Sequence, residues 1–269
     1  MKSLLSRFHI RPSKKLGQNF LLYETALGEI VNAAELSRED KVLEIGPGTG
    51  NLTRLLAEKA GEVLAIEKDR KFYQALRKFF KHYKNVNIIH DDVLFFKPET
   101  YNLQLTTYKL IANIPYYITG KLLQNFLSNQ KYRPSLVVLL LQKEVAERIV
   151  AKPGQMSLLS VSVQFYAQAE IISLVSRENF YPKPEVDSAI VRLRILEKPR
   201  LAVNEKKFFQ LVKISFANKR KQLHNNLAAG LGQKQDYKSI LVDLSLNPLA
   251  RAQDLSLEDW GRLYECLRP

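Results

Sequence analysis

The sequence predicts an α/β protein with a Rossmann-like, doubly wound sheet, mostly parallel with an antiparallel edge, followed by a small all-α C-terminal domain. Beyond residue 200 only helical patterns appear. Before it, five short and nearly continuous apolar runs alternate with helical patterns, as is typical of parallel strands buried on both faces. These runs are KVLEIG (41–46), EVLAIE (62–67), NVNIIHDD (85–92), YKLIAN (108–113) and SLVVLLLQ (135–142).

Two of the connections between these runs have clear helical patterns. NLTRLLAEKAG (51–61) ends in Gly61, a residue suited to a helix C-cap, and DRKFYQALRKFFKHY (69–83) opens on Asp69, a good N-cap residue. The rhythm changes after residue 154. LLSVSVQFYAQAEIISLV (158–175) and SAIVRLRIL (188–196) resemble strands without an intervening helix, which predicts an antiparallel pair at the edge of the sheet.

The stretch LEKPRLAVNE (196–205) has the proline and charges of a linker, and we place a domain boundary near residue 200. The first domain is expected to span residues 1–200, with a basic arm at 1–20, and the second to span residues 201–269. The net charge of +14 is concentrated in two regions, +5 in residues 1–20 and +6 in residues 198–269. This distribution favours a protein that binds a nucleic acid with both basic regions; a solvated basic surface is the alternative.

Cysteine content and hydropathy indicate where the protein works. Cys266 is the one cysteine of the sequence, so no internal disulfide can form, and no Cys/His cluster suggests a metal site. No apolar run reaches the roughly 20 residues that a membrane-spanning helix needs. We therefore expect a cytoplasmic protein without metal or membrane association. The basic, acid-free start would also fit an organellar transit peptide, which is the weaker interpretation.

Polar residues and glycines fall where the predicted strands end. EIGPGTGNLT (44–53) places Gly46 and Gly48 in a turn after the first strand, and Glu67, Asp92 and Asn113 follow the next three. Open α/β sheets bind ligands at this edge, and an acid at the second strand binds ribose hydroxyls in such folds. Asn51 stands where a dinucleotide-binding loop has its third glycine, so a dehydrogenase is disfavoured. Tight turns and caps without a ligand are the alternative explanation.

Six segments in order resemble the motifs of one family, the ribosomal RNA adenine dimethyltransferases known as KsgA/Dim1, which are class I S-adenosylmethionine-dependent methyltransferases. The segments are KKLGQNFL (14–21), EIGPGTGNLT (44–53), NIPYYIT (113–119), LQKEVAERIVA (141–151), NFYPKPEVDSAIVRL (179–193) and FANKRKQLHNNL (216–227). The sequence departs from the family at Tyr23, where many members have an acid, and at Gly120, where Ser is commoner.

The resemblance implies S-adenosyl-L-methionine as the cofactor, with Glu67 on its ribose and Asp92 on its adenine. It also implies a group of cofactor-binding residues, Asn19, Leu21, Gly46, Gly48, Glu67, Asp92 and Asn113. The tetrad Asn113, Ile114, Pro115 and Tyr116 would hold the target base, with Phe180 on its other side, although a loop aromatic beside prolines is equally often core packing.

Asparagine suits adenine methylation although it cannot exchange a proton. The N6 lone pair of adenine is delocalised into the ring, so attack requires the amine to become pyramidal. An amide carbonyl at Asn113 that accepts an N–H hydrogen bond favours this form and stabilises the developing positive charge. Pro115 would fix the turn, and the Tyr116 ring could stack on an extruded base.

For RNA binding we expect two basic clusters, Lys14 and Lys15 in the arm and Lys219, Arg220 and Lys221 in the C-terminal domain. Solvated helix faces are the alternative, and a metal-binding or catalytic His224 is disfavoured. The resemblance implies a monomeric enzyme of ribosome biogenesis that dimethylates N6 of two adjacent adenines near the 3′ end of small-subunit rRNA in an assembling subunit. The alternatives are methylation of large-subunit rRNA, as in antibiotic resistance, and a noncatalytic assembly or transcription factor with the same fold.

Overall fold

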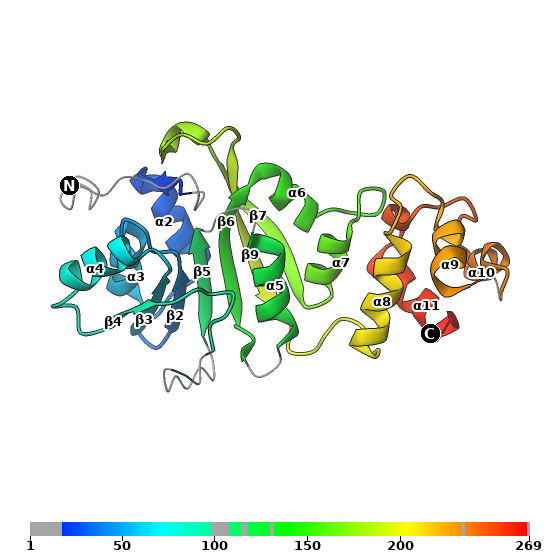
Figure 1. The fold of residues 1–269 in the computed structure, drawn as a ribbon, viewed down its shortest axis with the longest axis horizontal. Coiled ribbons are helices and arrows are strands. Elements are labelled where there is room, and N and C mark those ends of the chain that lie inside the picture. The colour runs from blue at the N-terminus through cyan, green and yellow to red at the C-terminus, as the bar shows by residue number, and fades with distance from the viewer. Residues whose placement is uncertain are drawn as a thin grey trace. The chain divides into compact units, whose positions relative to one another are not determined.

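A computed structural model describes residues 18–97, 100, 108–113, 118–129, 132–232 and 235–267 (Figure 1). The strands in this part of the chain are β1 (Phe20–Leu21), β2 (Lys41–Ile45), β3 (Glu62–Glu67), β4 (Val86–His90), β5 (Lys109–Asn113), β6 (Leu136–Gln142), β7 (Ala167–Val175), β8 (Phe180–Tyr181) and β9 (Ser188–Ile195). The α-helices are α2 (Glu24–Ala33), α3 (Asn51–Lys59), α4 (Arg70–Phe79), α5 (Thr119–Ser128), α6 (Lys143–Ile149), α7 (Leu158–Gln164), α8 (Glu205–Ser215), α9 (Leu223–Leu231), α10 (Tyr237–Asp243) and α11 (Leu257–Leu267).

One large sheet has seven strands in the order β4-β3-β2-β5-β6-β9-β7. Strands β4, β3, β2, β5 and β6 run parallel, and β9 pairs antiparallel to β6 with Arg192 opposite Val138. The five apolar runs of the sequence form these five parallel strands, and β9 lies beyond them. The predicted fold class, a mostly parallel sheet with an antiparallel edge, is confirmed, as is the helical C-terminal part.

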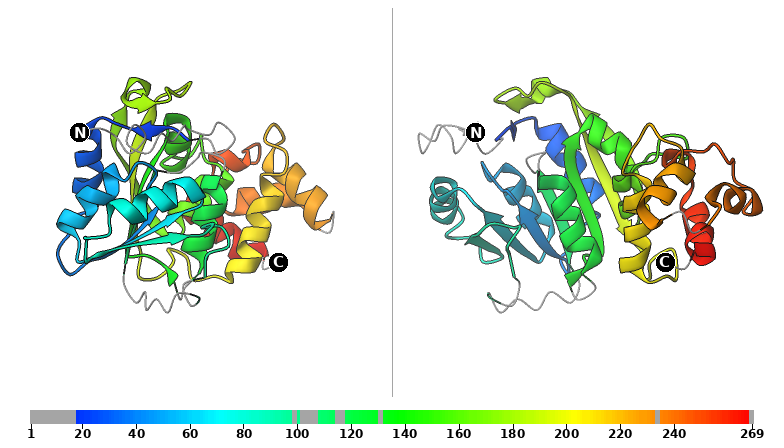
Figure 2. Two further views of the ribbon diagram at one scale, coloured as in Figure 1. Left: turned by 60° about the vertical axis from the view of Figure 1, so that its left-hand side comes forward. Right: turned by 45° about the vertical axis from the view of Figure 1, so that its right-hand side comes forward.

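Both faces of the parallel sheet are covered. Val42, Ile111 and Val138 point to one face, where they share a core with buried residues of α2 and α3. Their neighbours Leu43 and Leu110 point to the other face and are also fully buried. Figures 1 and 2 show α5 over this second face, and its buried stripe includes Leu122, Leu123, Phe126 and Leu127. Burial on both sides explains why the strands have nearly continuous apolar sequences.

Two local predictions were wrong. Residues 158–164, expected to be strand, form helix α7, because Ser157 caps its first turn in a capping box with Ser160. Gly61 is not the C-cap of α3; that residue is Ala60, in an extended conformation. Gly61 instead lies so close to the loop between α2 and β2 that a Cβ on it would be 2.2 Å from the Arg38 carbonyl oxygen. Its lack of a side chain permits close contact of two backbones.

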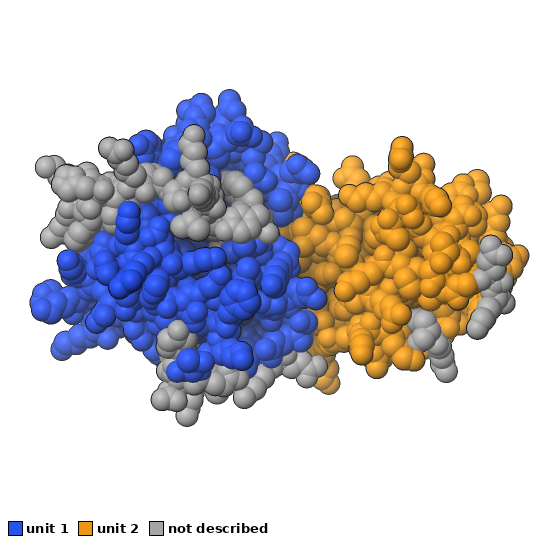
Figure 3. All heavy atoms as spheres, in the orientation of Figure 1, with its two compact units in different colours: residues 1–146, 169–195 blue, residues 147–168, 196–269 orange. Residues whose placement is uncertain are grey.

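The chain divides into two compact units, residues 1–146 with 169–195 and residues 147–168 with 196–269 (Figure 3). The second unit contains α7 to α11, whose core includes Trp260 and a group of rings around Phe165 and Phe208, 5.2 Å apart. The sequence-based boundary near residue 200 counts residues 147–168 with the first domain, whereas their packing counts them with the helical unit. No described helix is long and apolar enough to cross a membrane.

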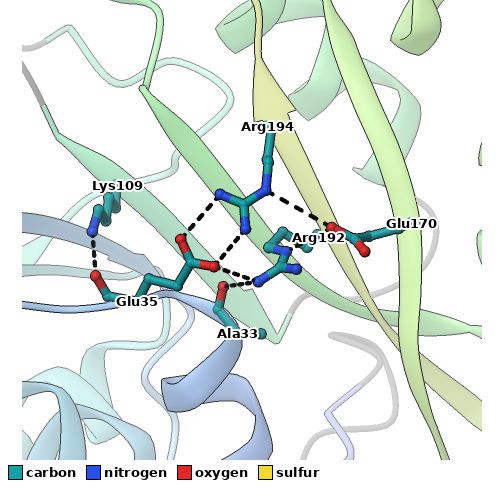
Figure 4. Close-up of polar contacts among 6 residues, drawn as sticks. All are labelled: Ala33, Glu35, Lys109, Glu170, Arg192 and Arg194. Atoms are coloured by element: carbon teal, nitrogen blue, oxygen red, sulfur yellow. Dashed lines mark hydrogen bonds and ion pairs between the residues drawn. The ribbon is translucent and has the colours of Figure 1, made fainter.

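An ionic network ties α2 to the antiparallel edge of the sheet (Figure 4). The Glu35 carboxylate, just after α2, accepts hydrogen bonds from Arg192 and Arg194 of β9, and Arg192 Nε also lies 2.8 Å from Glu170 of β7. Lys109 Nζ donates to the Glu35 carbonyl oxygen, 2.6 Å away. The Arg194 side chain lowers the pKa of Glu35, which keeps the carboxylate ionised. These contacts hold the end of α2 against strands that lie far from it in the sequence.

Candidate active site

The carboxyl edge of the parallel strands has a cavity lined by residues of four strand ends. Glu67 and Asn113 are the last residues of β3 and β5, Asp92 comes two residues after β4, and the loop after β2 contains Gly46 and Gly48. All five line this one cavity. The sequence predicted this convergence, because parallel strands place their carboxyl ends at the same edge.

The glycine loop passes directly beneath an aromatic ring. Gly48 has a φ of +52°, and a Cβ on it would be 2.7 Å from Cε1 of Phe20. A Cβ on Gly46, where φ is +71°, would be 3.4 Å from the Asn113 carbonyl oxygen. Both positions have a left-handed backbone that favours glycine, and at Gly48 the Phe20 ring also leaves no room for a Cβ.

Glu67 is 6% exposed and is held by main-chain amides. Its Oε2 accepts a hydrogen bond from the Gly48 N–H at 3.2 Å, and its Oε1 accepts one from the Asp69 N–H at 2.7 Å. Burial raises the pKa of Glu67 to about 7, although these amides favour the ionised form. The carboxylate therefore fixes the glycine loop relative to the end of β3.

Asp92 is held differently. Its Oδ1 accepts the Leu94 N–H at 3.0 Å, and its Oδ2 lies 2.8 Å from Lys68 Nζ. Burial opposes ionisation, but the hydrogen bonds from Lys68 and from the Leu94 N–H, together with the charges of Lys68 and Lys121, outweigh it and lower the pKa of Asp92. The cavity thus has an ionised carboxylate on the β4 side and a protonatable one, Glu67, on the β3 side.

The segment before α2 forms a further wall of the cavity. Asn19 and Leu21 line it, together with Gln18 and Phe20. Strand β1 pairs antiparallel with β8, with Phe20 opposite Tyr181, and forms a separate two-stranded sheet. This pairing fixes the segment whose Phe20 ring lies against the glycine loop, and the two predicted N-terminal residues of the site, Asn19 and Leu21, line the cavity on either side of Phe20 in the chain.

Phe180 does not line the cavity. It is 6% exposed and packs in the core of the first unit, whereas the next residue, Tyr181, is 54% exposed. A role of Phe180 against the target base stays a prediction. Ile114, Pro115, Tyr116, Lys14 and Lys15 lie outside the described residues.

The basic cluster of the second unit lies in the turn between α8 and α9. Lys219, Arg220 and Lys221 are all exposed there. Asn226 of α9, itself 2% exposed, holds this turn by donating from Nδ2 to the carbonyl oxygens of Ser215 at 2.7 Å and Asn218 at 3.1 Å. Three cations on a fixed turn make a surface suited to phosphates.

The family model for "Ribosomal RNA adenine dimethylase" matches residues 10–268. The chain belongs to this family. The enzyme is accordingly an S-adenosylmethionine-dependent methyltransferase that dimethylates adenine in ribosomal RNA. A curated relative from Dehalococcoides mccartyi (strain CBDB1), ribosomal RNA small subunit methyltransferase A, is 44% identical over 97% of this chain and 90% of its own length.

Two solved structures resemble the dimethylase over nearly its whole length. A dimethyladenosine transferase from Plasmodium falciparum has a TM-score of 0.79 at 28% identity, covering 93% of this chain and 97% of its own. The 23S rRNA methyltransferase ErmE has a TM-score of 0.75 at 27% identity, covering 93% of this chain and all of its own. The two TM-scores are nearly equal, so the fold alone does not decide which of these two activities the chain shares.

Sequence reasoning missed Glu44, an acid inside β2 that also lines the cavity of the dimethylase. It is 1% exposed, and its Oε2 has no hydrogen-bond partner among the residues that the structure describes. Burial, with a smaller contribution from the Glu67 charge, raises the pKa of Glu44 to about 8. The signal was present in KVLEIG, where a single charge interrupts a run buried on both faces.

Among the described residues no group of three or more His, Cys, Asp or Glu side chains could hold a metal ion.

A pH dependence of stability follows from Glu44. Its folded-state pKa is raised, so the folded enzyme binds more protons than the unfolded chain between about pH 4.5 and 8. The stabilisation is complete below the unfolded pKa and is lost as pH rises through the folded pKa. We expect Glu44 to lower the free energy of unfolding of the ligand-free dimethylase by roughly 2–4 kcal/mol between pH 5 and 8, measured by urea denaturation. Glu67, whose pKa is raised to about 7, adds a fall of the same sign. Glu44→Gln should therefore reduce the fall without abolishing it; an unchanged slope would contradict this assignment.

Proposed function

We propose that the enzyme methylates N6 of two adjacent adenines near the 3′ end of small-subunit rRNA, in an assembling small subunit, as a cytoplasmic monomer. The observation that carries the proposal is the convergence of Glu67, Asp92 and Asn113 on one cavity. The name of the Dehalococcoides relative supports the small subunit as the substrate. Methyl transfer is assigned to residues 1–200, and RNA binding to residues 201–269 with the basic arm 1–20.

The cavity fits a cationic nucleoside cofactor. Two buried carboxyl groups, Glu44 and Glu67, line it, and Glu44 Oε2 has no hydrogen-bond partner in the described part of the chain. Buried acids of this kind are stabilised as anions by a positive ligand. S-adenosylmethionine, when bound, supplies an electrophilic methyl group on a positively charged sulfur. We assign its ribose to Glu67 and its adenine to Asp92, with Asn19, Leu21, Gly46 and Gly48 as the remaining walls.

The chemistry of this chain rests on Asn113. Its side-chain oxygen accepts a hydrogen bond from the target N6 amine and, with a backbone carbonyl of the following turn, favours the pyramidal form that attacks. Asn113 is neutral, so no charge must be neutralised when the base enters. The alkylated amine is strongly acidic and loses its proton to water, which removes the need for a catalytic base. Pro115 and Tyr116 are assigned to the turn and to stacking on the base.

Mass spectrometry of rRNA tests this function. Small-subunit particles lacking the modification are incubated with enzyme and S-adenosylmethionine, and large-subunit rRNA is treated in parallel. We expect N6,N6-dimethyladenosine in the small-subunit rRNA alone. Modification of the large-subunit RNA would instead support the activity of the ErmE type, and a lack of product with either RNA would support a noncatalytic assembly factor.

The exposed basic turn gives a second prediction. Replacing Lys219, Arg220 and Lys221 together with alanine should weaken RNA binding and reduce the slope of log affinity against log salt by roughly 2–3, because each cation neutralises one phosphate. Filter binding across salt concentrations measures both quantities. Cofactor affinity, measured by calorimetry, should be unaffected. A salt slope identical to that of the wild type would show that these three residues are a solvated surface without a role in RNA binding.

A further inference from the structure

Phe95 is the most exposed large apolar side chain of the described residues, at 71%. It follows β4 in a tight turn: its N–H donates to the Asp92 carbonyl oxygen at 2.9 Å, and the Leu94 N–H donates to Asp92 Oδ1. The turn is therefore fixed to a residue of the cavity. A ring of this size left in water by a hydrogen-bonded turn suggests a binding role.

A lysine of α5 completes the surface around Phe95. Lys121 Nζ lies 5.5 Å from the centre of the Phe95 ring, and Asn125 of the same helix donates to the Leu94 carbonyl oxygen at 3.4 Å. Lys121 is exposed, and its charge is close enough to Asp92 to contribute to the lowered pKa of that carboxyl. The ring and the ammonium group thus form one unit, fixed on two elements.

This unit lies at the margin of the active-site cavity. Leu94, which precedes Phe95, and Ile118, which precedes α5, both line the cavity along with Asn113. Lys97, two residues after Phe95, is also exposed. The margin therefore offers one exposed aromatic ring with a cation, Lys121, beside it and a second exposed lysine two residues along the chain. An exposed aromatic ring among cations suits a nucleotide, which has a π-face and a phosphate, better than an apolar protein surface.

We propose that Phe95 and Lys121 bind an unpaired RNA nucleotide next to the methylated adenine, with its base stacked on the Phe95 ring and its phosphate beside Lys121. The proposal rests on the function proposed above. An adenine reaches Asn113 only when it leaves its stack, and this exposes the face of the neighbouring base. Stacking on Phe95 compensates for that lost contact at the margin of the cavity.

The test uses RNA oligonucleotides that contain the target adenines, with a normal or an abasic nucleotide on their 5′ or 3′ side. Phe95→Ala should bind the normal RNA roughly 10-fold more weakly than the wild type. One of the two abasic RNAs should weaken wild-type binding similarly and cause no further loss in the variant. If the loss of affinity caused by Phe95→Ala and the loss caused by the abasic nucleotide added in full for both abasic RNAs, the proposal would be overturned.

Further variants separate stacking from packing and charge. Phe95→Tyr should retain binding, whereas Phe95→Leu, apolar but not planar, should not. Lys121→Ala should reduce the salt slope by about 1. The matched controls are Leu174→Ala, an exposed apolar residue on β7, and Lys59→Ala, an exposed lysine at the end of α3; both should bind RNA like the wild type.

Cofactor binding and product formation distinguish the possible failures. Calorimetry with S-adenosylmethionine should give the same affinity for Phe95→Ala and the wild type; a weaker affinity in the variant would assign Phe95 to the cofactor and overturn the proposal. If the wild type methylates the RNA and Phe95→Ala binds it equally well, the nucleotide site is wrong while the proposed function stands. If the wild type forms no dimethyladenosine, the proposed function itself fails.

Discussion

Replacing Asn113 with alanine is expected to lower the rate of methyl transfer by roughly 10²–10³-fold, the usual effect of removing one preorganised polar group from an active site. Asn113 ends β5 in register with Leu140 of β6, and it lines the cavity. Its loss should leave the sheet intact, because strand pairing uses main-chain groups, which the substitution keeps. Single-turnover kinetics measures the chemical step, and RNA affinity should survive.

Asn113→Asp separates two accounts of this residue. A carboxylate also accepts hydrogen bonds but carries a desolvation cost in the cavity, so we expect activity between those of the alanine variant and the wild type. If the residue acted as a base, Asp would match or exceed Asn, with a rate that rises through the pKa of the new carboxyl. A wild-type rate for Asn113→Ala would refute the assignment altogether.

The second large effect concerns Glu67. Glu67→Ala should weaken S-adenosylmethionine binding by roughly 1–3 kcal/mol, about 5- to 150-fold, because a carboxylate that accepts ribose hydroxyls makes charge-assisted hydrogen bonds. The variant also leaves the Gly48 and Asp69 amides without their present acceptor. Titration calorimetry measures the affinity, and RNA binding should hardly change.

Glu62→Ala is the matched control. Glu62 is the first residue of the strand that ends at Glu67, and it forms a half-exposed ion pair with Lys41. We expect this variant to bind the cofactor like the wild type. Should a folded Glu67→Ala variant bind S-adenosylmethionine as tightly as the control does, the ribose must be held elsewhere.

The five parallel strands were predictable because each is a short apolar run between helical patterns, and their ends predicted where Glu67, Asp92 and Asn113 would meet. Residues 158–164 were not, because alternating valine and serine fits a strand as well as a capped helix and local caps decided the outcome. The burial of Glu44 was foreshadowed by a charge inside a run predicted to be buried on both faces, but no sequence pattern shows that this side chain lines the cavity. The pairing of β1 with β8 joins segments that no local pattern connects.

The two-stranded sheet of β1 and β8 has a consequence for the order in which the site can be built. Phe20 and Leu21 have their strand partners at Tyr181 and Phe180, about 160 residues later. A growing chain leaves the ribosome from its N-terminus, so the wall formed by Gln18 to Leu21 has no strand to pair with until residue 181 has emerged. The glycine loop, Glu44 and Glu67 are synthesised early, whereas the segment that covers them has its strand partner only after β8 has been made. The cavity therefore acquires its last wall only when synthesis of the first unit is nearly complete.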